Sequence, residues 1–159
     1  RNVYVEEWSL CSDELKLDNV PEGWRIEKRR LKGGLQDGID EITACNGTVT
    51  VTIHPTKGMG IHSVSMGEVS LGWKSPVADK VHPYYVNLED NNGLGWLYSF
   101  NGWMVRCGIE WSGHPGVDDG RLMSLHGKIN HIPASEVKVI VTKTGTIKIC
   151  GMVREVWFK

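Results

Sequence analysis

The residues best suited to chemistry lie close together, between Gly93 and Ala134. This segment holds three of the seven tryptophans, three of the six histidines and one of the four cysteines. Tryptophan offers a flat apolar face, and histidine can exchange a proton near neutral pH. Because glycine-rich segments between strands usually form loops that carry function, we expect functional loops here, on a scaffold of β-sheet.

Aromatic rings combined with a few fixed polar groups are typical of a carbohydrate site. A sugar has apolar C–H faces and a rim of hydroxyl groups, so its site needs a flat platform and hydrogen-bonding groups at the edge. The candidates are the platforms Trp73, Trp96, Trp103 and Trp111, the donor Arg106 and the titratable His126. Any one of these tryptophans is more often a core residue, so only their combination favours a sugar pocket.

Other chemistries have weaker support. His54 and His62 flank the loop at residues 55–60 and could meet across a hairpin. A metal site needs three or four converging ligands, however, and neither H-x-H nor H-E-x-x-H occurs, so we predict no metal and no cofactor. The sequence also lacks G-x-S-x-G and Walker phosphate-loop motifs. Cys107 lies beside Arg106, but it is better explained as a core residue on a strand.

The bulk composition limits the class of protein. A chain of 159 residues suits one domain, and a formal charge of −1 without any Lys/Arg run gives no electrostatic footprint for nucleic acid. No apolar run reaches the ~18–20 residues that span a bilayer, and no signal peptide is visible. We therefore expect a cytoplasmic protein with no nucleic-acid and no membrane partner. The four scattered cysteines predict reduced, mostly buried thiols.

Alternating apolar residues predict β-strands on both sides of the functional segment. The expected elements are an edge strand at 2–8, a strand at 24–31, hairpins at 39–54 and 61–73, one or two helical turns at 97–104, and strands at 105–110, 136–142 and 146–159. Asn46-Gly47 predicts a type I′ turn, because both residues tolerate positive φ. The predicted fold class is all-β, with antiparallel sheets packed as a sandwich.

The domain organisation follows from the same pattern. Residues 1–23 are expected to form an irregular lead-in, and residues 24–159 belong to one sandwich domain. The last predicted strand continues to the end of the sequence, which leaves an unpaired edge of a kind that folded proteins avoid. We therefore expect residues 24–159 to be part of a larger domain.

Seven short blocks occur in an order that resembles the N-terminal half of a bacterial branch of the galactose mutarotase (aldose 1-epimerase) superfamily. They are RLKGGLQDG (30–38), PTKGMGI (55–61), LGWKSP (71–76), GLGWL (93–97), VRCGI (105–109), LHG (125–127) and IPA (132–134). The resemblance implies an antiparallel β-supersandwich, of which residues 24–159 are the N-terminal portion. The missing C-terminal half is then an expected partner, as part of the same polypeptide or as a separate chain.

The resemblance also implies a reaction, the interconversion of sugar anomers by acid/base ring opening. A carboxylate base takes the proton of the anomeric hydroxyl and a histidine acid protonates the ring oxygen, with no metal or cofactor. In relatives the acid lies in a downstream motif beginning Tyr-His, and the base is a glutamate near the C-terminus. Neither motif occurs in this sequence, so we expect the chain alone to lack the catalytic pair.

Individual residues take roles by the same resemblance. His126 resembles the histidine of the superfamily's His-Gly motif, which contacts the sugar near its ring oxygen, and it is the catalytic candidate. Arg106 resembles an arginine that holds sugar hydroxyls, and Lys57 stands where relatives often carry arginine. Asn101-Gly102 departs from relatives, which often show glutamate at the second position. The other residues expected to bind a monosaccharide or sugar derivative are Trp96, Trp111 and Asn130.

Two alternatives stay open at this point. A non-catalytic carbohydrate-binding or scaffold protein would keep the sugar cleft without the proton transfer. A sugar-active lyase or hydrolase could also use the same fold, because a fold does not fix a reaction.

Overall fold

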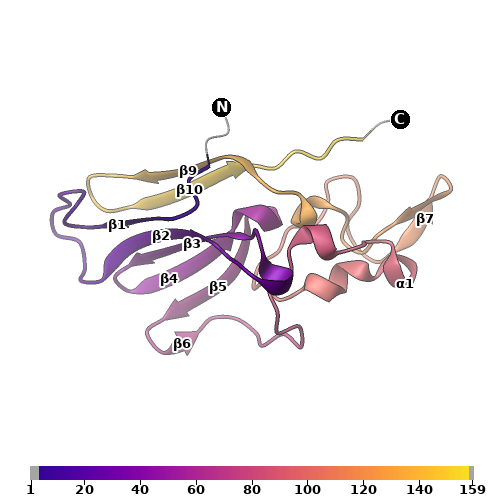
Figure 1. Ribbon diagram of the computed structural model, residues 1–159, viewed down its shortest axis with the longest axis horizontal. Helices are drawn as coiled ribbons and strands as arrows, with labels where there is room; N and C mark the ends of the chain where they lie inside the picture. The colour runs from indigo at the N-terminus through magenta and orange to yellow at the C-terminus, as the bar shows by residue number, and fades with distance from the viewer. Residues whose placement is uncertain (1–3, 158–159) are drawn as a thin grey trace.

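The computed structural model describes residues 4–157 and is built almost entirely from strands and loops (Figure 1). The strands are β1 (Trp8–Cys11), β2 (Trp24–Arg30), β3 (Asp40–Asn46), β4 (Val49–His54), β5 (Gly60–Met66), β6 (Val69–Ser70), β7 (Gly116–Asp118), β8 (Arg121–Met123), β9 (Ser135–Val141) and β10 (Ile147–Met152). Helix α1 (Asp90–Gly93) is accompanied by short 3₁₀ helices at Gly34–Gln36, Pro55–Lys57, Pro83–Tyr85, Gly95–Ser99 and Ile129–His131. The predicted all-β class is confirmed.

Strands β1 to β6 form one antiparallel sheet in which every strand lies beside its neighbours in the sequence. The register sets apolar residues in rows across the strands. One row contains Ile26, Ala44, Val51 and Val64, each directly opposite the next. Because directly opposed residues of an antiparallel pair point to the same side, this row gives the sheet one apolar face.

The second layer of the sandwich is the hairpin of β9 and β10, which lies over that face (Figure 1). The core contains Trp24, Ile26, Ile42 and Ala44, packed against Val137, Val139, Val141, Ile147 and Ile149 of the hairpin. The predicted alternation of residues 136–142 is therefore correct. At the end of the hairpin, Trp24 Nε1 donates a buried hydrogen bond of 2.8 Å to Gly145 O, which joins the two layers.

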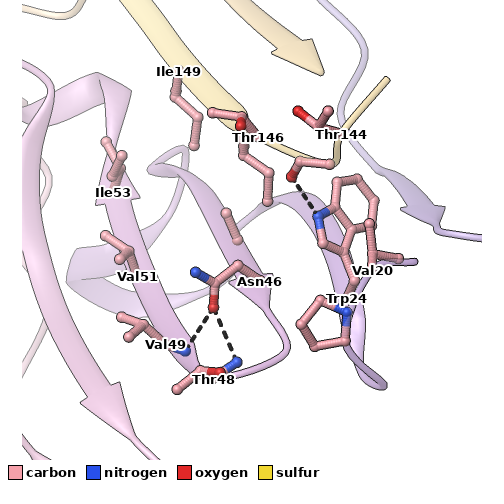
Figure 2. A pocket seen from close by; sticks show the side chains of 14 residues that line it. Val20, Trp24, Asn46, Thr48, Val49, Val51, Ile53, Thr144, Thr146 and Ile149 are labelled. Carbon is pink, nitrogen blue, oxygen red and sulfur yellow. Dashed lines mark hydrogen bonds between the residues drawn. The ribbon is translucent and has the colours of Figure 1, made fainter. Parts of the chain in front are cut away.

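The turn predicted at Asn46-Gly47 joins the expected strands but has a different geometry. The last pair between β3 and β4 is Cys45–Thr50, and of the Asn-Gly pair only Gly47 has positive φ, at 92°. Asn46 Oδ1 instead accepts hydrogen bonds from the backbone N–H groups of Thr48 and Val49, at 3.0 and 2.8 Å (Figure 2). The prediction of a type I′ turn is wrong, because the side chain of Asn46 accepts the backbone hydrogen bonds of a different turn.

Sequence reasoning missed a hairpin between β7 and β8. Its two-residue loop contains Asp119 and Gly120, at φ 47° and 73°, between the paired residues Asp118 and Arg121. Positive φ at both positions is what a type I′ turn requires. The Asp-Gly dipeptide was the available signal, although the short strands around it gave no long alternation.

Several predicted boundaries are also corrected. The edge strand expected at 2–8 lies at Trp8–Cys11, and residues 2 and 3 lie outside the described residues. The helical turns expected at 97–104 are the 3₁₀ helix Gly95–Ser99, whereas Met104 forms a bridge with Ile61. The last strand ends at Met152, and residues 158 and 159 lie outside the described part.

The strand expected at 105–110 is absent from the structure, where this segment is irregular. Its backbone bonds go to a neighbouring loop: Gly108 N donates to His126 O, and Ile129 N donates to Gly108 O. All four cysteines are free, but only Cys45 is buried and Cys107 is exposed. The prediction of mostly buried thiols, and of Cys107 as a core residue, is therefore wrong.

The segment between β6 and β9 gathers at one end of the sandwich (Figure 1). Its regular structure is limited to α1, the β7–β8 hairpin and three of the 3₁₀ helices. Five of the six predicted site residues come from this segment, and Lys57 comes from the 3₁₀ helix that follows β4. Within residues 4–157, no helix has the length and apolar character needed to cross a membrane.

Candidate functional site

A loop at residues 124–131 holds the candidate site together. Leu125 N donates to Gly93 O at 2.8 Å, and His126 N donates to Gly113 O at 2.8 Å. The carbonyl of His126 accepts from Gly108 N at 2.9 Å. Backbone bonds to three separate loops thus fix the loop around His126, and this arrangement explains why the glycine-rich segment can be ordered without long strands.

The His126-Gly127 pair has a physical reason in this loop. Both residues have positive φ, 55° at His126 and 72° at Gly127. A Cβ on Gly127 would lie 2.9 Å from Gly108 O and still closer to the carbonyl oxygen of Trp111. The backbone conformation and the close packing therefore both require glycine after His126.

The side chain of His126 rests against Trp96. The two rings meet edge to face with centroids 4.9 Å apart, and Trp96 also packs on Phe100 at 4.8 Å. His126 is half-buried, whereas Trp96 is only 2% exposed. The ring of Trp96 thus has no open face in this structure, and its position is that of a support under His126.

Lys57 and Asn130 come together in the interior. They are 4% and 1% exposed, and both line a small cavity of about 10 Å³ together with His62 and Gly102. Lys57 Nζ donates to Ser99 O at 2.7 Å. Burial lowers the pKa of Lys57 from its ordinary value of 10.5 to about 8. The side-chain amide of Asn130 has no hydrogen-bond partner among the described residues, which is rare for a group so deeply buried.

His131 connects Lys57 to the aromatic support. Its Nε2 lies 2.8 Å from Ser99 Oγ, and its ring centroid lies 6.4 Å from that of Trp96. Burial, and then the charge of Lys57, lowers the pKa of His131 to about 4. His131 is therefore neutral at pH 7, where it can exchange hydrogen bonds but carries no charge. Sequence reasoning counted this histidine in the functional segment but gave it no role.

His54 and His62 meet as the hairpin geometry suggested, with stacked rings 4.4 Å apart. They form no metal centre: no group of three metal-binding side chains occurs among residues 4–157. His54 Nε2 instead lies 2.9 Å from Glu41 Oε2. Burial lowers the pKa of both histidines, to about 3 for His62, where the neighbouring His54 adds to the effect.

Glu41 is the centre of a buried ionic cluster that the sequence pattern did not reveal. The carboxylate is 2% exposed and accepts two hydrogen bonds from Arg29, at 2.6 and 2.9 Å, besides its contacts with His54 and Lys80. Burial alone would raise the pKa of Glu41, but the hydrogen bonds from these three partners outweigh it and hold the pKa well below its ordinary value. The cluster links β2, β3 and β4 with the loop that carries Lys80.

Arg106 and Trp111 line two other cavities of the described residues, one each. Arg106 is exposed and lines an open groove of about 540 Å³ that includes Cys107 and Ile109. Trp111 lines a different cavity of about 370 Å³, which also contains Trp157 and Lys128. The structure thus joins Lys57 with Asn130 and Trp96 with His126, but it brings the six residues into no common pocket of the described part.

The chain is similar to one protein family and to one solved structure. A family model described as a domain of unknown function (DUF4432) matches residues 36–159, and no curated protein matches the chain. The crystal structure of a proposed aldose 1-epimerase from Klebsiella pneumoniae is similar, with a TM-score of 0.90 and 42% sequence identity over 97% of this chain. The match covers 40% of that protein, so the present chain spans about two fifths of its length.

Proposed function

Since the chain belongs to the DUF4432 family, we propose that it forms one wall of the sugar site in an enzyme of the aldose 1-epimerase type. The observation that carries the proposal is the 42% identity and TM-score of 0.90 with the Klebsiella protein, over nearly the whole of this chain. That similarity agrees with the expected all-β, mutarotase-like fold and with the expected membership of the galactose mutarotase superfamily. The proposed ligand is a monosaccharide or a sugar derivative, and the proposed location is the cytoplasm.

His126 is the residue that we assign to the sugar ring. Its half-buried imidazole rests on Trp96, and three backbone hydrogen bonds to neighbouring loops fix the segment that carries it. A histidine held in this way can donate a hydrogen bond to the ring oxygen without first losing conformational freedom. Arg106 is exposed and has the planar set of donors that suits pairs of sugar hydroxyls.

The buried residues have a positioning role in this proposal. Lys57 and Asn130 are nearly inaccessible, so we assign them to the packing that holds the wall in place. Trp96 likewise supports His126 from below. Trp111 lines an open cavity beside Gly127 and remains a candidate platform for a sugar face.

We further propose that residues 24–159 are the N-terminal portion of a larger domain and that the catalytic acid and base come from its remainder. The support is the coverage of the Klebsiella structure, of which 40% corresponds to this chain. Proton transfer at an anomeric carbon needs two groups with tuned pKa values on opposite sides of the sugar. This chain, as one wall of the site, would bind and orient the sugar but would not supply both of these groups.

The test joins the chain to the part of the Klebsiella protein that lies outside the match, in one polypeptide. Saturation-transfer NMR on aldoses measures the rate of anomer exchange, and saturation-transfer difference spectra measure sugar binding. We expect exchange well above the buffer rate and a loss of at least tenfold in His126→Ala. His114→Ala, which changes an exposed histidine of the same segment, is the matched control and should keep the rate.

Two results would contradict parts of this proposal. A folded fusion that binds sugar but leaves exchange at the buffer rate would refute the epimerase and favour a non-catalytic sugar-binding protein. A His126→Ala variant with a much lower melting temperature but unchanged sugar binding would show that His126 is structural.

A further inference from the structure

The small cavity beside Lys57 is lined by polar side chains that have no partner among the described residues. Neither the oxygen nor the nitrogen of the Asn130 amide has a hydrogen-bond partner there, and the same is true of Nδ1 of His62. Asn130 is only 1% exposed. Because a buried polar atom without a partner costs free energy and is rare, these atoms point to a bound group in the cavity.

Two glycines keep room open in this cavity. Neither Gly60 nor Gly102 has a positive φ, so their backbone conformations are available to any residue. A Cβ on Gly60 would lie 3.1 Å from Lys57 O and 3.5 Å from Asn130 Oδ1. Met104 O lies 3.6 Å from the same point. Three oxygen atoms thus surround one position beside Gly60, and glycine serves there to leave space rather than to allow an unusual conformation.

The size and charge of the cavity limit what can bind. It measures about 10 Å³. A buried water needs about 10–15 Å³ and two to four polar partners, so the cavity suits one water and is too small for a sugar or a phosphate. The lining residues include Lys57 and no carboxylate, a combination that does not favour a metal cation.

We propose that this cavity binds one ordered water molecule, which donates hydrogen bonds to Asn130 Oδ1 and Lys57 O and has His62 Nδ1 as a third partner. The water joins β5, which begins at Gly60, to the 3₁₀ helices Pro55–Lys57 and Ile129–His131. Asn130 belongs to the loop at residues 124–131, so the water ties the loop around His126 to the large sheet. Asn130 is then a positioning residue, and the water gives its buried amide a partner.

The test uses the single-polypeptide fusion described above. Its crystal structure should show density for one water within hydrogen-bonding distance of Asn130 Oδ1. Gly60→Ala places a methyl group beside that oxygen and should abolish the density. Gly72→Ala is the matched control, because Gly72 also lacks a positive φ and its new Cβ would lie against the side chain of Trp103 at an ordinary 3.5 Å. The water should remain in this variant.

Hydrogen exchange tests the same site in solution. Loss of the water should speed exchange of the Ile129 and His131 amides about tenfold in Gly60→Ala and not in Gly72→Ala. Asn130→Leu removes the amide that needs the water, so in that background Gly60→Ala should change exchange by less than about twofold. Gly60→Ser supplies a hydroxyl in place of the water, and its amides should exchange more slowly than those of Gly60→Ala.

Three outcomes would overturn the inference: no density beside Asn130, a side chain of the Klebsiella part in the position of the water, or equal exchange in Gly60→Ala and Gly60→Ser with no dependence on Asn130. The last would show that crowding against Lys57 O explains the whole effect. If Gly60→Ala does not fold, the density should still be present in the wild type and absent from Asn130→Leu. An ordered water together with anomer exchange at the buffer rate would refute the proposed function alone.

Discussion

Replacing Gly127 by alanine places a methyl group against two backbone carbonyls, and the chain offers a matched control for this change. Gly127 and Gly120 have nearly the same φ, 72° and 73°. At Gly120 the new Cβ meets nothing within 4 Å, whereas at Gly127 it lies 2.9 Å from Gly108 O and closer still to the carbonyl of Trp111. The difference between the two variants therefore measures the packing around the His126 loop alone.

The magnitude follows from these two contributions. A non-glycine residue in the left-handed region costs about 1–2 kcal/mol, and this cost applies to both variants. Overpacking adds about 1–3 kcal/mol at Gly127, since backbone carbonyls cannot move aside as a flexible side chain can. We expect a loss of about 2–5 kcal/mol for Gly127→Ala and about 1–2 kcal/mol for Gly120→Ala.

Urea denaturation followed by far-UV circular dichroism gives the free energy of unfolding of each variant. A larger loss for Gly127→Ala, by about 1–3 kcal/mol, would support the close packing at this loop. Equal losses in the two variants would refute it, because the left-handed backbone would then account for the whole effect. The requirement for glycine beside His126 would no longer have a packing basis.

Two further predictions concern buried charges. Because the pKa of Lys57 falls from 10.5 to about 8 on folding, the unfolded chain binds more protons than the folded chain between these pH values. The free energy of unfolding should therefore rise by about 3 kcal/mol as the pH rises through this window. Urea denaturation at pH 7.5 and 10.5 should show this gain in the wild type and not in Lys57→Met, and equal pH dependence in the two proteins would contradict it. Glu41→Gln should cost about 3–5 kcal/mol, because it leaves the buried His54 and the half-buried Lys80, as well as the exposed Arg29, without their carboxylate. Glu27→Gln, at a carboxylate that is 54% exposed, should cost less than about 1 kcal/mol in the same assay, and similar losses at both positions would refute the role of the cluster.

The strands could be predicted where one face of a strand is buried and the other is exposed. Residues 136–142 alternate because Val137 and Val139 pack on the core and Lys138 does not. Alternation does not predict the start of β3, where the consecutive residues Asp40 and Glu41 are both buried and both form ion pairs. Partners from other strands decide such positions, and local periodicity carries no information about them.

The candidate site was predictable in location but not in arrangement. Composition alone marked the segment that contains His126 and His131, and the structure gathers its loops around residues 124–131. Which side chains are accessible depends on contacts between distant loops, such as the bond from Lys57 to Ser99, 42 residues apart in sequence. A tryptophan that could be a platform, such as Trp96, is therefore indistinguishable by sequence from one that supports a neighbour.

The order of the six-stranded sheet has a consequence for synthesis of the chain. Each of β1 to β6 pairs with its sequence neighbour, so this sheet can form from local contacts soon after β6 is made. The hairpin that covers its apolar face, and that receives the bond from Trp24, ends about 80 residues later, at Met152. At 5–20 residues per second this interval lasts roughly 4–16 s. During it the nascent sheet carries its apolar face uncovered, and this is the period when chaperones or aggregation would compete with folding.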